Sequence, residues 1–122
     1  MILIDAANVV GSRPTGWWKD RPGAARTLVE RVRTATTAGA LDAPVVIVLE
    51  GAARKGVEEG TSDGVQIVHA RGSGDDALAD IASRATESVI LVSADRGLRE
   101  RLPAHGRSVG PSWLYDRLPS DQ

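Results

Sequence analysis

The sequence predicts a three-layer α/β/α domain with a central parallel sheet of four or five strands. Two observations carry this prediction. Four short runs of β-branched and other apolar residues are unbroken by polar alternation, as in strands buried on both faces of a parallel sheet: Met1–Ile4, Val45–Leu49, Val65–Val68 and Val89–Val92. Amphipathic helical patterns separate these runs, and such alternation is typical of a parallel sheet that helices cover on both faces.

The helices are predicted from the i, i+3, i+4 spacing of apolar residues. Four segments have this pattern: Pro22–Ala38, Asp75–Ala85, Arg96–Leu102 and Ser112–Leu118. Asp20 can cap the start of the first helix, and Gly39 ends it. A weaker fifth strand is predicted at Ser108–Gly110. The glycines and charges of residues 50–64 predict a loop with at most one helical turn.

The length and composition of the chain restrict its class. A chain of 122 residues suits one domain, so residues 1–122 are expected to form a single unit. The absence of cysteine excludes disulfides, thiolate zinc sites and thiol catalysis. No segment is apolar for long enough to span a membrane, and the start lacks the features of a signal peptide, so a cytoplasmic protein is expected. The net charge of −1 gives no overall basic field that would attract nucleic acid.

Acidic residues follow the predicted strands, where ligands bind in open α/β sheets. Asp5 closes the first strand and Glu50 the second, Asp75 and Asp76 begin the helix after the third, and Asp95 follows the fourth. Carboxylates that converge on one edge repel one another unless a cation lies between them. Oxygen ligands favour Mg²⁺ or Mn²⁺ over zinc. The sequence therefore predicts a divalent-metal site, with the first and fourth strands adjacent at the centre of the sheet.

Helical phase separates the two acids at the start of the second predicted helix. At about 100° per residue, Asp75 flanks the apolar stripe that faces the sheet, whereas Asp76 lies toward solvent. Asp75 is therefore predicted to be the better metal ligand, and Asp76 is the second candidate. A structural role stays open for Asp75 and Asp95, because aspartate is also a good helix N-cap. Asn8 could hold the Asp5 carboxylate or a phosphate, or form a turn.

Three segments of the chain resemble the NYN branch of the PIN-like ribonucleases: ILIDAAN, GSGDDALADIA and ILVSADRGLRER. The similarity lies in Asp-x-x-Asn after a strand, a small residue before two aspartates at a helix start, and Ser-x-Asp after a later strand. It extends from Met1 to about Trp113 and implies a single PIN-like (NYN) domain over residues 1–122. It also implies a ribonuclease that hydrolyses RNA phosphodiester bonds with Mg²⁺ or Mn²⁺ held by Asp5, Asp75 and Asp95. Glu50 stands where the family often has aspartate, so a supporting role is expected for it.

Basic and aromatic residues are predicted near the acidic edge, where they would bind substrate. Arg54 follows the second strand, and Arg96 resembles the family's polar position after the last acid. A basic rim around an acidic centre would neutralise the phosphates of a nucleic acid. Trp17 and Trp18 can stack on an unpaired base, or one of them can pack the first loop onto the core. Single-stranded RNA is therefore the expected partner, and the sequence leaves open whether the chain forms a homodimer.

Two further interpretations stay open. A PIN-like RNA-binding or scaffold module that has lost catalysis would keep the fold without the metal, and a toxin of a toxin–antitoxin pair would keep the activity. Other phosphate chemistries are excluded. Trp17 and Trp18 stand where a Walker loop requires lysine and serine or threonine, and Ala7 stands where a haloacid-type phosphatase requires a second acid. His69 and His105 are expected to be structural or solvated.

Overall fold

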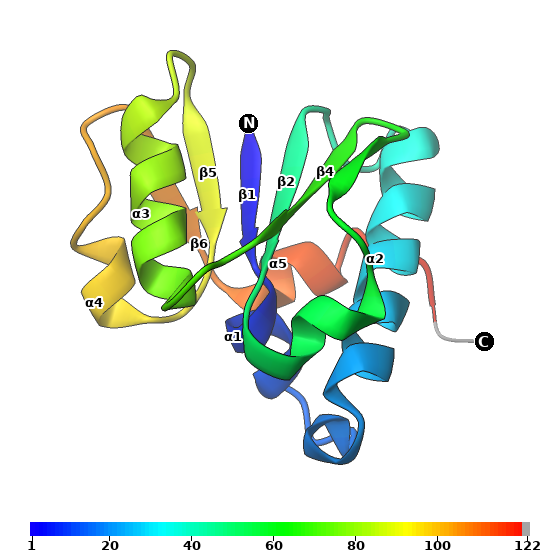
Figure 1. The fold of residues 1–122 in the computed structure, drawn as a ribbon. Coiled ribbons are helices and arrows are strands. Elements are labelled where there is room, and N and C mark those ends of the chain that lie inside the picture. The colour runs from blue at the N-terminus through cyan, green and yellow to red at the C-terminus, as the bar shows by residue number, and fades with distance from the viewer. Residues whose placement is uncertain (121–122) are drawn as a thin grey trace.

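The computed structural model describes residues 1–120, whose six strands form one sheet in the order β3-β4-β2-β1-β5-β6 (Figure 1). The strands are β1 (Ile2–Asp5), β2 (Val45–Leu49), β3 (Gly60–Ser62), β4 (Val65–His69), β5 (Val89–Val92) and β6 (Gly106–Val109). Neighbouring strands are parallel except β3 and β4, which pair antiparallel. The predicted α/β class is confirmed. The prediction of a parallel sheet of four or five strands is wrong in the number of strands and in the direction of β3.

The unpredicted strand β3 is exposed along its whole length, so it lacks the apolar run by which the other strands were found. It pairs with β4 across a two-residue turn, Asp63–Gly64, whose φ angles are 54° and 77°. Asp-Gly is a preferred pair for such turns, because both positions need positive φ for the turn to match the twist of the strands. This dipeptide is the signal in the sequence that indicates the hairpin.

Within residues 1–120, six helices, including two short 3₁₀ helices, lie between strands, and a seventh, α5, follows the last strand. They are α1 (Ala6–Gly11), η1 (Trp17–Lys19), α2 (Arg21–Thr37), η2 (Gly51–Gly56), α3 (Gly74–Arg84), α4 (Arg96–Arg99) and α5 (Pro111–Tyr115). The four predicted helices are confirmed as α2, α3, α4 and α5, with α4 and α5 shorter than expected. α1 was not predicted, since six residues that include two valines show no helical pattern. None of the helices within residues 1–120 is long and apolar enough to cross a membrane.

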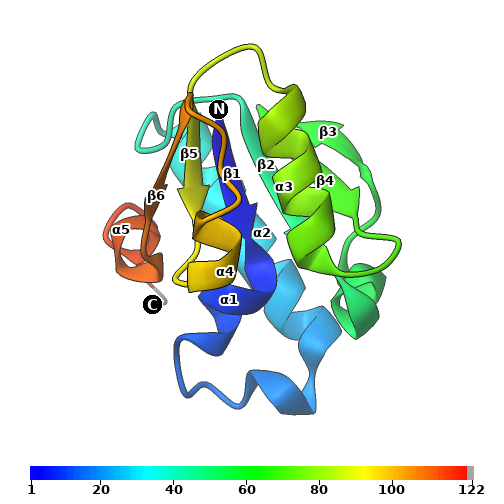
Figure 2. The same cartoon turned by 90° about the vertical axis from the view of Figure 1, so that its left-hand side faces the viewer.

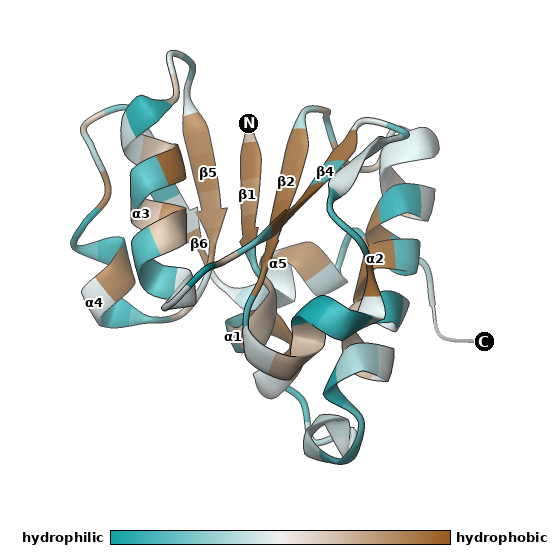
Figure 3. Ribbon diagram, viewed as in Figure 1, coloured by the Kyte–Doolittle hydropathy of each residue, from teal (hydrophilic) through white to brown (hydrophobic). Residues whose placement is uncertain are grey.

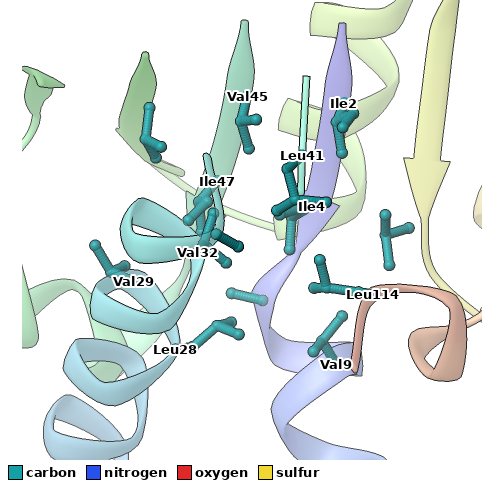
Figure 4. Packing of buried hydrophobic residues seen from close by; sticks show 14 of the residues in the cluster. Ile2, Ile4, Val9, Leu28, Val29, Val32, Leu41, Val45, Ile47 and Leu114 are labelled. Atoms are coloured by element: carbon teal, nitrogen blue, oxygen red, sulfur yellow. The ribbon is translucent and has the colours of Figure 1, made fainter. Parts of the chain in front are cut away.

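Helices pack against both faces of the sheet (Figures 1 and 2). On one face Ile4 of β1 packs with Val32 of α2, and residues of α1 and α5 join the same cluster (Figure 4). On the other face Leu3 packs with Leu78 of α3 and Leu98 of α4. Successive residues of a strand point to opposite faces, so β1 must be apolar at every position before its last. The hydropathy colouring shows the same uniformly apolar character along the central strands (Figure 3).

The register of the central strands determines which side chains meet at the carboxyl edge of the sheet. β1 and β5 are adjacent at the centre, as predicted, and Ile4 of β1 is paired with Val92 of β5. The next residues along these strands, Asp5 and Ser93, are therefore neighbours. α1 begins after β1 and α4 follows β5 at this same edge (Figure 2). Glu50 directly follows β2 nearby, so the topology brings several polar residues to one place.

Candidate functional site

Asp5 is a buried acid at the carboxyl end of the central strand, with 5% of its surface exposed. It caps α1, because its Oδ1 accepts a hydrogen bond from the backbone N–H of Asn8 at 3.3 Å. Its Oδ2 accepts a second bond from the Ser93 hydroxyl at 2.8 Å. Burial raises the pKa of Asp5, the two hydrogen bonds oppose that rise, and the charges of Asp75 and Glu50 add to it. A buried carboxylate of raised pKa at this edge is typical of a functional site.

Ser93 links Asp5 to the segment that carries Asp95, and it was not among the predicted site residues. Its side chain is completely buried. Its hydroxyl donates to Asp5 and accepts from the backbone N–H of Asp95 at 3.1 Å. The signal for this residue was the Ser-x-Asp pattern after the fourth predicted strand. That pattern places a small hydroxyl group where β5 leaves the sheet beside Asp5.

Asp95 and Asn8 both have structural roles in the same loop. Asp95 is the N-cap of α4, and its Oδ1 accepts a hydrogen bond from the backbone N–H of Leu98 at 3.0 Å. The alternative prediction that Asp95 is a helix N-cap is therefore confirmed. The side-chain oxygen of Asn8 accepts from the backbone N–H of Ala94 at 2.8 Å, so this side chain holds the β5–α4 loop rather than the Asp5 carboxylate. Asn8 thus positions Asp95 relative to β1.

The acids at the start of α3 differ as the helical phase predicted. The cap of α3 is Ser73, whose hydroxyl accepts from the backbone N–H of Asp76 at 3.2 Å, so the capping alternative for Asp75 is wrong. Asp75 is half-buried in the first turn. The side chain of Asp76 is 75% exposed and forms an ion pair with Arg101 at 2.9 Å. Of the two, Asp75 is the acid that faces the site.

Glu50 joins the end of β2 to the start of α3. Its Oε2 accepts a hydrogen bond from the backbone N–H of Gly74 at 2.9 Å. A Cβ at Gly74 would lie 2.9 Å from the carboxyl carbon of Glu50, so glycine permits this close approach. Desolvation raises the pKa of Asp75, and the charges of Asp95 and Glu50 raise it further. Since Glu50 and Asp75 also raise the pKa of Asp5, the four acids share one electrostatic environment.

The donor chemistry at this edge fits a hard divalent cation, because every candidate ligand is a carboxylate. His69 ends β4 at this same edge, but both histidines hydrogen-bond to backbone carbonyls, His69 to Val57 at 2.7 Å and His105 to Ala82 at 2.8 Å, so their expected structural role is confirmed. Within residues 1–120, however, no three acidic, histidine or cysteine side chains are grouped closely enough to hold a metal ion. The charges of these carboxylates thus influence the pKa values of Asp5 and Asp75, although their side chains are not grouped as the ligands of one metal ion.

The two arginines predicted to bind substrate differ in their surroundings. Arg54 donates from Nε to the carbonyl of Gly51 at 3.0 Å and from Nη1 to the carbonyl of Ala70 at 3.3 Å. These bonds join η2 to the loop after β4 and give Arg54 a structural role. Arg96 is exposed at the first residue of α4, directly after Asp95. Arg96 is therefore the better candidate for a contact with phosphate.

The two tryptophans also differ. Trp18 is 54% exposed, whereas Trp17 is half-buried. Their rings meet edge to face with centroids 5.9 Å apart. The guanidinium of Arg21 lies over the Trp17 ring at 5.3 Å from its centroid. Both rings lie in the segment that joins α1 to α2, and α1 itself begins directly after Asp5.

Comparison of the chain with protein-family models, with curated proteins and with solved structures found no match. The similarity of three short segments to NYN domains therefore stays a prediction.

The raised pKa values predict how stability depends on pH. Asp5 and Asp75 have folded-state pKa values above the unfolded value of 3.8. Their contribution to stability is complete below that value and is lost as the pH rises through the folded pKa. Asp5→Asn removes one ionisation, so in metal-free buffer the variant should become more stable relative to the parent between about pH 4 and pH 7. Urea denaturation across this range measures the difference, and a difference that stays constant would contradict it. Asp42→Asn, an exposed change before β2, is the control.

Proposed function

We propose that the chain is a metal-dependent ribonuclease that hydrolyses RNA phosphodiester bonds with the help of Mg²⁺ or Mn²⁺. The observation that supports this most is the electrostatic coupling of Asp5, Asp75, Asp95 and Glu50 at the carboxyl edge of the sheet. The charges of Asp75 and Glu50 raise the pKa of Asp5, and those of Asp95 and Glu50 raise the pKa of Asp75, so a divalent cation would stabilise the ionised acids of this site. The segments that resemble NYN domains contribute Asp5, Asp75 and Asp95, and that resemblance is the reason for choosing RNA as the substrate.

Asp5, Asp75 and Asp95 would hold the cation. Asp76 is a reserve ligand, which would first have to leave its ion pair with Arg101. A bound Mg²⁺ or Mn²⁺ would lower the pKa of a coordinated water and stabilise the charge that develops on the phosphate and the leaving oxygen. No histidine is required as a general base in such chemistry.

The remaining polar residues would position these ligands. Ser93 orients the Asp5 carboxylate through its 2.8 Å hydrogen bond, and Asn8 holds the loop that precedes α4. Glu50 fixes the first turn of α3 through the backbone N–H of Gly74, and so fixes the start of the Asp75 segment. Arg96, exposed beside the last acid, would contact a phosphate of the bound strand.

A second candidate is an RNA-binding module of the same fold without catalysis. It is favoured by the absence, within residues 1–120, of three grouped ligands, and by the hydrogen bonds that already engage both oxygens of Asp5. Asp95 is likewise engaged as a helix cap. Such a module would bind single-stranded RNA through the exposed Trp18 and its neighbours and would need no metal.

Cleavage of end-labelled single-stranded RNA distinguishes the two candidates. The parent protein should cleave RNA of mixed sequence with millimolar Mn²⁺, should stop when a chelator is added, and should resume with excess Mn²⁺. Asp5→Asn should abolish cleavage, whereas Asp42→Asn at the opposite edge should not. A parent protein that retards varied RNAs on a native gel but leaves them intact with Mn²⁺ would exclude the ribonuclease and favour the binding module.

A further inference from the structure

A pocket of about 360 Å³ lies directly beside the acidic edge. Its wall includes Ala6 and Ala7, which follow Asp5 in the first turn of α1, and Glu50 of the acidic group itself. The rest of the wall comes largely from the segments that carry Trp17, Arg21 and Gly72. The volume is at the lower end of the range for ligand pockets, which suits one small group rather than a large ligand.

The wall of this pocket offers flat surfaces between small residues. The alanines add little bulk, and a Cβ built at Gly72 would meet no other atom within 4 Å. The Trp17 ring and the Arg21 guanidinium, which lies 5.3 Å above it, are both planar. Aromatic rings and guanidinium planes are the surfaces on which proteins stack unpaired bases. Trp18, the more exposed ring, does not line this pocket.

The charges in the wall favour a neutral ligand inside the pocket and a phosphate outside it. The Glu50 carboxylate would repel a phosphate but can accept hydrogen bonds from the amino group of a base. Arg21 is exposed and can neutralise a backbone phosphate that runs past the pocket. This combination fits a nucleotide whose base is inside and whose backbone remains at the surface.

We propose that this pocket binds one unstacked nucleobase of a single-stranded RNA, so that an adjacent phosphodiester lies at the acidic edge. The inference takes its ligand class from the proposed ribonuclease function. It goes beyond that function by assigning the base to a defined pocket, with Trp17 rather than Trp18 as the stacking ring. Base recognition beside the acids would place the strand relative to Asp5, the acid that Ala6 follows.

Fluorescence anisotropy with two probes tests the pocket. One probe is a short labelled oligoadenylate, and the other is the same ribose-phosphate strand without bases. Both are titrated in EDTA, so that no cleavage interferes.

Ala7→Leu should fill the pocket from an exposed position of α1. It should weaken oligoadenylate binding by about 5- to 150-fold, the effect of losing one base stack, and should leave binding of the base-free strand unaffected. Trp17→Ala should show the same selective loss. Ala52→Leu, an equal change on η2 outside the pocket, should match the parent with both probes.

The pocket is refuted if the parent binds both strands equally, or if Ala7→Leu and Trp17→Ala weaken binding of both strands or of neither. If Ala7→Leu lowers the melting temperature, Gly72→Val fills the same space from another segment and should give the same selective loss. The assay contains no metal, so its result is independent of catalysis. A parent that binds bases selectively but cleaves no RNA would refute the ribonuclease and keep the pocket. A parent that cleaves RNA but binds both probes equally would refute the pocket and keep the ribonuclease.

Discussion

The Asp95→Asn variant should lose RNA cleavage and keep its fold. Asparagine caps helices about as well as aspartate, so the hydrogen bond from the backbone N–H of Leu98 should survive. A metal ion contributes several kcal/mol to the stabilisation of a hydrolytic transition state, and each 1.36 kcal/mol changes a rate tenfold, so losing a ligand should lower the rate at least about a hundredfold. Initial rates with Mn²⁺ and thermal melts without it measure the two properties.

Thermal melts with and without Mn²⁺ show whether Asp95 is a metal ligand or only the N-cap of α4. A ligand that binds only the folded state stabilises it by about 2.7 kcal/mol at a hundredfold excess over its Kd, so the parent should gain stability with Mn²⁺. Asp95→Asn should gain much less, and without metal it should be at least as stable as the parent. Asp80→Asn, an exposed change further along α3, should behave as the parent. Equal shifts with Mn²⁺ in the parent and in Asp95→Asn would mean that Asp95 holds no metal.

Ser93→Ala should destabilise the fold more than any other change of a single hydroxyl at the site. The Ser93 side chain is fully buried and donates to the buried Asp5 carboxylate at 2.8 Å. A hydrogen bond to a charged group contributes about 1.5–3 kcal/mol, and its removal leaves Asp5 with one donor fewer. The segment of Asp95 would also lose the acceptor for its backbone N–H, so cleavage should fall as well.

The effect of Ser93→Ala should depend on pH. The hydrogen bond from Ser93 lowers the pKa of Asp5, so its loss should raise that pKa further above the unfolded value of 3.8. The penalty for ionising Asp5 in the folded state then increases, and the destabilisation should grow as the pH rises from about 4 to 7. Urea denaturation measures it, with Ser88→Ala, an exposed change just before β5, as the control. If both variants were equally stable at every pH, the Asp5–Ser93 bond would not contribute to stability.

Much of the fold could be predicted because buried parallel strands have an unambiguous pattern. Val45–Leu49 is buried at every position, and the predicted bounds are those observed. Two elements had no such pattern. α1 depends on Asp5 as its cap and on packing of Val9 in the core, and β3 depends on a turn at Asp63–Gly64. Tertiary contacts and turn conformation, rather than periodicity, determine both.

The site could be predicted only in part for a related reason. The predicted ends of the strands showed where the acids would lie. The helical phase correctly predicted that Asp75 is half-buried and Asp76 exposed to solvent. The bonds that orient them could not be derived, since they depend on the register between β1 and β5, far apart in the sequence. That register is what places Ser93 against Asp5. The hydrogen bonds of Arg54 likewise follow from the path of η2, which the sequence pattern does not reveal.

The central claim is that a divalent cation binds at the carboxyl edge of the sheet through Asp5. Isothermal titration of Mn²⁺ into the metal-free parent and into Asp5→Asn tests it most directly, because it requires no knowledge of the RNA. The parent should show saturable binding, and Asp5→Asn should show none while unfolding as cooperatively as the parent. Absence of binding by the parent, or equal binding by both proteins, would contradict the claim.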